Sequence, residues 1–259
     1  MTDTSEGRYE QPLGIGDIIS ETFSILIGNI QSVLIMGGIP SLISLLLTWG
    51  ILGAAFVTGG LDPDPTDLQD GFNGFGMFIV SLISFAIYGI VLALFVQLAY
   101  DSKLGRSVQP MRYIQPALGS VVHIVLLTII ITLLVIIPLM LFIVPGLWVY
   151  AVFSVCIPAV IIERAGFGAL GRSVSLTKEY RWPIVGLIVV FGVIFVLINL
   201  AGTFVAGMIP GGPIIGIIVL SVIYSVVYGM SGILVALIYA RLKEIKEGAS
   251  VNDLVAIFD

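Results

Sequence analysis

VVHIVLLTIIITLLVIIPLMLFIVPGLWVYAVFSVCIPAVII, residues 121–162, is the stretch of this sequence that decides the fold. It belongs to a longer segment, 113–162, that contains no Asp, Glu, Lys or Arg. A helix needs about 20 apolar residues to cross the hydrocarbon core of a bilayer, so this segment is long enough for two crossings. Proline lacks an N–H donor and glycine tolerates turn conformations, so we expect the VPG at Val144–Gly146 to form the turn between them.

The same pattern covers most of the chain. Three further segments lack charged residues, 22–61, 71–100 and 182–240, and we assign them one, one and two crossings. PGGP, Pro210–Pro213, predicts the turn that divides the last of them. Of the 259 residues, 58% are hydrophobic and only 10% are charged, whereas soluble domains carry about 25% charged residues. These numbers indicate a membrane protein.

The predicted fold is an all-α polytopic membrane bundle of six transmembrane helices, arranged as three hairpins with interfacial helices on the cytoplasmic side. The expected spans are 32–58, 75–100, 119–142, 146–162, 183–208 and 214–240. Together they form one membrane domain, 13–245, between a polar N-terminal tail at 1–12 and a cytoplasmic C-terminal tail at 246–259.

Basic residues predict the orientation of these spans. All eleven Lys and Arg residues precede span one, follow span six, or lie between spans two and three or spans four and five. The three opposite loops contain none, and the first of them, LDPDPTDLQDG, has four aspartates. Because basic residues are retained on the cytoplasmic side during insertion, we expect both termini to face the cytoplasm.

The pentapeptide LGRSV occurs twice, at 104–108 and 170–174, each time in a predicted cytoplasmic segment just before a hairpin. Chance recurrence in a biased composition is the alternative. A third lead-in, GIGDIISETFSILIGNIQS at 14–32, places Ile18, Phe23 and Leu26 on one helical face and Asp17 and Glu21 on the other. This spacing predicts a helix that lies in the membrane interface with its apolar side towards the lipid.

The loop between spans four and five carries the candidate lipid-headgroup contacts. Clustered cations beside aromatic residues can bind anionic headgroups, or they can simply set topology next to an aromatic interface belt. Both interpretations stay open from the sequence. The residues are Arg164, Arg172, Lys178, Arg181 and Trp182. GFGALG, 166–171, matches the G-x-G-x-x-G pattern, but no βαβ unit surrounds it, so we expect no dinucleotide cofactor.

Neutral polar residues within the predicted spans form the second candidate set. They would hydrogen-bond between helices or line a polar pathway for a substrate. They are Gln97, His123, Asn199, Thr203, Tyr224 and Tyr228. Span six also presents small residues at about four-residue spacing, which predicts close helix packing within the monomer or, alternatively, dimerisation. These are Ser221, Ser225, Gly229, Gly232, Ala236 and Ala240.

Missing residue types argue against several functions. No carboxylate lies within a predicted span, so we identify no catalytic residue, metal ligand or coupling-ion site. Walker A, G-x-S-x-G and H-E-x-x-H patterns are absent from the sequence. The net charge of −5 does not suggest a nucleic-acid partner. We therefore expect a protein without enzymatic activity or cofactors.

IVPGLWVYAVFSVCIPAVIIERAGFGALGRSVSLTKEYRW, residues 143–182, resembles the membrane domain associated with glycerophosphoryl diester phosphodiesterases. The matching positions are Pro145, Gly146, Trp148, Pro158, Arg172, Ser173, Leu176, Thr177, Lys178 and Trp182. The resemblance is most specific in these residues and looser elsewhere, where GDIISETFSIL and the six-span layout are also similar. It implies a multi-span protein of the bacterial inner membrane. Only a short tail follows span six, so the resemblance implies no phosphodiesterase activity here.

Two hypotheses about function follow. The first is a non-enzymatic membrane module that binds or organises lipid, anionic lipid included, or a protein partner, with a homo-oligomer as one form of partner. The second is a transporter or channel for a small neutral or amphiphilic molecule, because glycine and proline interrupt spans such as MGGIPS at 36–41. A continuous polar pathway through Asn199, Thr203 and Tyr224 would favour transport.

Overall fold

A computed structural model of the chain describes residues 12–52, 72–208 and 212–248, and all its regular elements there are helices. Six of them are long and apolar enough to cross a membrane, which confirms the predicted all-α bundle and marks an integral membrane protein. These candidate spans are Ile30–Leu52, Gly76–Lys103, Val121–Leu141, Ile143–Glu163, Arg181–Ala206 and Ile214–Glu247. The predicted tails, the aspartate-rich loop, the end of span one and the first half of the PGGP turn lie outside the described residues.

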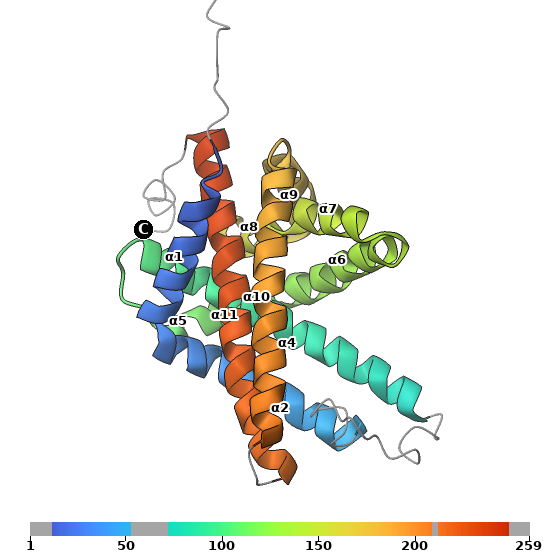
Figure 1. The fold of residues 1–259 in the computed structure, drawn as a ribbon. Coiled ribbons are helices and arrows are strands. Elements are labelled where there is room, and N and C mark those ends of the chain that lie inside the picture. Colours follow the sequence, from blue (N-terminus) through green and yellow to red (C-terminus); the bar gives the residue numbers. More distant parts are fainter. Residues whose placement is uncertain (1–11, 53–71, 209–211, 249–259) are drawn as a thin grey trace, which may run out of the picture.

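The longest helix, α11 (Gly212–Glu247), is the centre of the bundle. Two helices separated by a break at Asn29, α1 (Ile15–Gly28) and α2 (Ile30–Leu52), run antiparallel along it. The carbonyl of Pro12 accepts a hydrogen bond from Arg241 near one end of α11, and Ser41 donates to the carbonyl of Ser221 further down. Helix α4 (Phe72–Lys103) packs against both α2 and α11 (Figure 1).

The small residues of α11 serve packing within the monomer, as the first of the two sequence interpretations expects. A Cβ built at Gly229 would lie 2.8 Å from Val33, and one at Gly232 would lie 2.4 Å from the Cβ of Phe95. Conversely, Gly37 of α2 leaves room for the backbone of Ser225. Helices without a hydrophobic driving force between them associate through such close contacts.

Helix α1 differs from its prediction. Its apolar face contacts protein instead of lipid: Ile18 and Leu26 are buried, and the Phe23 ring stacks on Phe191 of α10 (Arg181–Met208) at 6.1 Å. The reason is the length of α11, whose 36 residues exceed the roughly 20 needed for a crossing. The excess length of α11 offers a protein surface that α1 covers.

The turn between the third and fourth spans also differs from its prediction. Phe142 separates α6 (Val121–Leu141) from α7 (Ile143–Phe153), so VPG begins the helix instead of forming the turn. Pro145 lies in the first helical turn, where no intrahelical N–H bond is needed. A Cβ at Gly146 would lie 2.6 Å from the Cα of Leu139, so glycine here permits the close approach of the two helices.

Shorter helices lie between the spans: α5 (Pro110–Gly119) before α6, and a 3₁₀ turn (Gly166–Gly168) and α9 (Ala169–Thr177) before α10. The short helix α8 (Cys156–Glu163) is the second part of the fourth span. The hairpins lie close to one another near these short helices and spread apart from one another further away (Figure 1). In α6, for example, Ile124 and Leu127 are buried whereas Leu139, Met140 and Leu141 are exposed. An apolar surface of this kind is suited to contact with acyl chains.

The two LGRSV copies adopt different structures. The first forms the C-terminal turn of α4, with Gly105 at positive φ and the amide of Arg106 donating to the carbonyl of Asp101. The second copy lies in α9, where Arg172 and Ser173 bond to other elements. The repeated sequence therefore does not mark a repeated structural unit.

Candidate functional site

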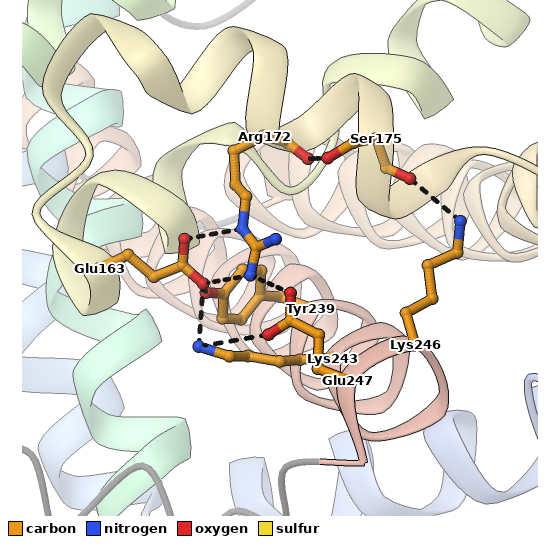
Figure 2. Close-up of polar contacts among 7 residues, drawn as sticks. All are labelled: Glu163, Arg172, Ser175, Tyr239, Lys243, Lys246 and Glu247. Atoms are coloured by element: carbon orange, nitrogen blue, oxygen red, sulfur yellow. Dashed lines mark hydrogen bonds and ion pairs between the residues drawn. The ribbon is translucent and has the colours of Figure 1, made fainter.

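A charged cluster joins α8, α9 and α11 at their common end (Figure 2). Its centre is the carboxylate of Glu163, the last residue of α8, which accepts two hydrogen bonds from the Arg172 guanidinium, each of 2.7 Å. It also accepts hydrogen bonds from the Tyr239 hydroxyl at 2.6 Å and from Lys243 at 2.9 Å. Glu247 completes the cluster by pairing with Arg172. Two carboxylates thus balance two cations in a partly buried cluster, in which Lys243 is buried and Glu247 is exposed.

This arrangement gives Arg172 a structural role. Its hydrogen bond to Glu163 raises the pKa of Arg172 above the ordinary value, with Glu247 adding to the effect and burial opposing it. Nearby, the Lys246 ammonium donates to the carbonyls of Ser175 and Lys178, at 3.0 and 2.8 Å. The cluster therefore ties the end of α11 to α8 and α9, and its paired guanidinium is not available as a headgroup ligand.

The other predicted headgroup residues lie apart from one another. The Arg181 guanidinium stacks on the Trp148 ring, 4.7 Å from its centroid. Arg164 ends α8 in a left-handed conformation with φ of 52°. Lys178 and Trp182 are exposed. The structure therefore does not bring the predicted set together as one cationic surface: Arg172 and Arg181 face protein groups, and Lys178 and Trp182 face outward.

The fourth span is broken near its middle. Helix α7 ends at Phe153 and α8 begins at Cys156, which leaves Ser154 and Val155 between them. The carbonyl of Val152 accepts hydrogen bonds from the hydroxyls of Ser173 at 2.7 Å and Thr177 at 3.2 Å, both on α9. A carbonyl released from the helix ladder must find another donor when it is buried. Two hydroxyls of α9 thus stabilise the break.

A cavity of about 290 Å³ lies beside this break. It is a half-open cavity bordered by α4, α7, α10 and α11, and Ser154 of the break is part of its wall. The lining residues are Tyr88, Tyr150, Ser154, Ile188, Phe191, Gly192, Phe195, Val227, Tyr228, Ser231, Leu234 and Val235. Small-molecule sites have volumes of about 300–1,000 Å³, so the cavity is at the lower end of that range.

The cavity combines an apolar wall with a few hydroxyl groups. Tyr88 interacts through its hydroxyl with Ser231 and Tyr150, and its ring packs edge-on against Tyr228 at 5.3 Å. Tyr88, Tyr150, Ser154, Tyr228 and Ser231 all lie well inside candidate spans. None of the residues that line the cavity is charged. Hydroxyls can both donate and accept hydrogen bonds, so the wall suits an uncharged polar group attached to an apolar body.

The predicted polar pathway is not assembled as expected. Only Tyr228 lines the cavity, with Tyr224 stacked on it at 6.1 Å. Asn199 donates to the carbonyl of Phe195 in its own helix at 2.8 Å instead of bonding to another helix, and Thr203 is exposed. These two residues lie one turn apart on α10; Asn199 is half-buried, and neither residue lines the cavity.

The other two members of that set occupy separate sites. Gln97 donates to the carbonyl of Tyr113 in α5 at 3.1 Å, which is the interhelical bond that the sequence analysis expects. The His123 ring packs on the ring of Phe167, with centroids 4.9 Å apart. Among the described residues, no group of His, Cys, Asp and Glu side chains could hold a metal ion.

Most of the cavity could not be predicted from the sequence. Tyr88, Tyr150, Ser154 and Ser231 come from three different spans and from the break, so no local spacing connects them. The available signal was a tyrosine or serine deep inside an apolar segment. That signal recurs at many positions that face elsewhere, so only the packing of the helices selects these four.

Comparisons with known proteins add no relative. No family model matches the chain, and neither a curated protein nor a solved structure matches it.

Proposed function

We propose that this integral membrane protein is a non-catalytic lipid-binding module, and that its cavity holds the polar end of one amphiphilic molecule. The cavity between α4, α7, α10 and α11 is the observation that carries the proposal. Its volume of about 290 Å³ is too small for a whole membrane lipid but sufficient for part of one.

The lining indicates the chemistry of the ligand. A charged headgroup would lose its hydration without gaining a counter-ion, because no charged side chain lines the cavity. A hydroxyl, ester or carbonyl group, in contrast, can exchange hydrogen bonds with Tyr88, Tyr150 and Ser231. The ligand class is therefore an uncharged amphiphile such as an acylglycerol, a polyisoprenoid alcohol or a fatty ester.

Two glycines of α10 provide a matched test. Gly192 lines the cavity, and a Cβ added there meets no atom within 4 Å, so Gly192→Leu should fill the cavity without disturbing the helices. Gly186 lies on the same helix, is exposed, and has equally open surroundings. Mass spectrometry of lipids retained after gentle purification should find one enriched uncharged species in the native protein and in Gly186→Leu, and its loss in Gly192→Leu. Equal retention by both variants would contradict the proposal.

Transport of the bound molecule is the second candidate function. The break at Ser154–Val155 favours it, because transporters build midplane sites from discontinuous helices, and Ser154 itself lines the cavity. Exchange of the labelled retained ligand across the bilayer of proteoliposomes separates the two functions. A binding module should leave the rate of ligand exchange equal to that of protein-free liposomes. A transporter should increase this exchange rate, and Gly192→Leu should abolish the increase.

We further propose that the protein resides in a bacterial inner membrane with both termini in the cytoplasm. The basic residues between spans support this orientation. A cysteine at Phe142, between α6 and α7, should react with a membrane-impermeant thiol reagent added outside intact cells, whereas one at Lys178 should react only after lysis. The opposite result at either position would overturn the orientation. That the chain belongs to the phosphodiesterase-associated family stays a prediction. That it binds a protein partner or forms a homo-oligomer also stays a prediction.

A further inference from the structure

Helix α5 exposes an apolar face that no described part of the chain covers. Met111, Ile114 and Leu118 are 81%, 39% and 56% exposed. Residues at these spacings lie on one side of a helix. Three large apolar side chains on one side of a ten-residue helix form a surface that water solvates poorly.

The opposite face holds α5 firmly on the end of α4. Tyr113 and Ala117 are buried, and the Tyr113 hydroxyl donates to Asp101 at 2.7 Å. Gln97 donates a hydrogen bond to the carbonyl of Tyr113, and the backbone amide of Gln109 donates one to the Tyr113 hydroxyl. Burial and the hydrogen bond to Asp101 raise the pKa of Tyr113, so this anchor stays protonated at neutral pH. The apolar face is thus fixed in its outward direction.

This face continues into the exposed strip of a membrane span. After the break at Ser120, Val122 of α6 is 63% exposed, and Leu126 and Ile130 follow at four-residue steps. Leu118, the last exposed apolar residue of α5, precedes Val122 by the same four-residue step. The row on α6 belongs to a candidate span with no charged residue and so contacts acyl chains. Continuity with that row places the α5 face at the edge of the same hydrocarbon layer.

Two cations stand at the start of this surface. Arg106 in the α4–α5 connection and Arg112 on α5 are exposed. Neither pairs with a carboxylate among the residues that the structure describes. Arg112 follows Met111 by one residue and therefore points about 100° away from it around the helix. Apolar side chains can then face the acyl region while the guanidiniums remain among the headgroups.

We propose that α5 is an interfacial helix that binds anionic lipid headgroups through Arg106 and Arg112, with Met111, Ile114 and Leu118 in the acyl boundary. Guanidinium groups form paired hydrogen bonds with phosphate oxygens, and each cation near an anionic surface adds to the attraction. This site is separate from the cavity and from the Glu163 cluster, whose guanidinium is already paired. It is also a different site from the one that the sequence predicts between spans four and five.

Depth measurements test the placement of the helix. Single cysteines at Met111, Leu118 and, as a control, Ser107 are introduced with Cys156→Ala and labelled with a nitroxide in nanodiscs of phosphatidylglycerol and phosphatidylcholine. Labels at 111 and 118 should collide mainly with dissolved oxygen, and the label at 107 mainly with a water-soluble nickel complex. Equal exposure of all three labels to the nickel complex would overturn the placement.

Selectivity for anionic lipid is measured in the same nanodiscs. A fluorophore at position 111 should be quenched several-fold more by brominated phosphatidylglycerol than by brominated phosphatidylcholine at equal mole fraction. In Arg106→Gln/Arg112→Gln this ratio should fall towards one. Lys178→Gln, which removes an exposed cation from the other loop, should leave it unchanged. An unchanged ratio in the double variant would refute the assignment of the headgroup site to α5.

Discussion

Gly232 lies where α11 passes closest to Phe95 of α4. A Cβ added at this position would lie 2.4 Å from the Cβ of Phe95 and 3.5 Å from the carbonyl oxygen of Leu92. The Phe95 atom is next to the backbone, so rotation of the aromatic ring cannot relieve the contact. Gly232→Ala must therefore move α11 and α4 apart.

The size of the effect follows from this geometry. Carbon atoms in contact prefer a separation of about 3.5–4.0 Å, so the helices must yield by roughly 1 Å. Overpacking of this kind costs typically about 1–3 kcal/mol. Alanine also gains about 1 kcal/mol of helix propensity over glycine, which partly offsets that cost. A control with the same propensity gain is therefore needed.

Gly186→Ala is that control, because a Cβ at Gly186 meets no atom within 4 Å. The propensity gain cancels between the two variants, so the free energy of unfolding of Gly232→Ala should be about 1–3 kcal/mol below that of Gly186→Ala. Equilibrium unfolding in mixed micelles of a mild detergent and dodecyl sulfate measures this difference. Equal stability of the two variants would refute the close packing of α4 and α11 at this point.

Two further variants test the contacts around α9. Ser173→Ala/Thr177→Val removes both donors to the buried carbonyl of Val152 and should destabilise the protein by about 1–3 kcal/mol in the same assay. Each single variant should lose less stability. Full stability of the double variant would contradict the role of these hydroxyls. Glu163→Gln should cost more than Glu21→Gln. The Glu163 carboxylate accepts hydrogen bonds from Arg172, Tyr239 and the buried Lys243, whereas Glu21 forms one more exposed pair, of the kind that contributes about 0.2–1 kcal/mol. Equal losses would show that the cluster adds no special stability.

The sequence was sufficient for the membrane fold because long charge-free segments have few alternatives. A backbone in hydrocarbon must satisfy its own hydrogen bonds, so segments such as 113–162 predict helices wherever they occur. Turn positions were harder to predict. Pro145 and Gly146 are common in turns, but proline is also tolerated in the first turn of a helix, and glycine also serves close packing.

The roles of charged residues depended on contacts across the chain. Arg172 is paired with Glu163, nine residues earlier, and with Glu247 of α11, far along the chain. Local composition indicated a basic loop but not the partner from α11. The amphipathic pattern of α1 was read correctly as one apolar face, but its partner depended on the length of α11. Local periodicity predicts that a face will be covered, and the tertiary structure decides what covers it.

Photo-crosslinking from α10 tests the central claim, that the cavity selects one amphiphile, most directly. Phe195 lines the cavity, whereas the neighbouring Val196 is exposed on the outer surface of the same helix. A photoreactive phenylalanine analogue at each position, activated in native membranes, would attach whatever molecule lies there. We predict a single dominant uncharged amphiphile at position 195 and the bulk lipid mixture at position 196. The same bulk mixture at both positions would contradict the claim.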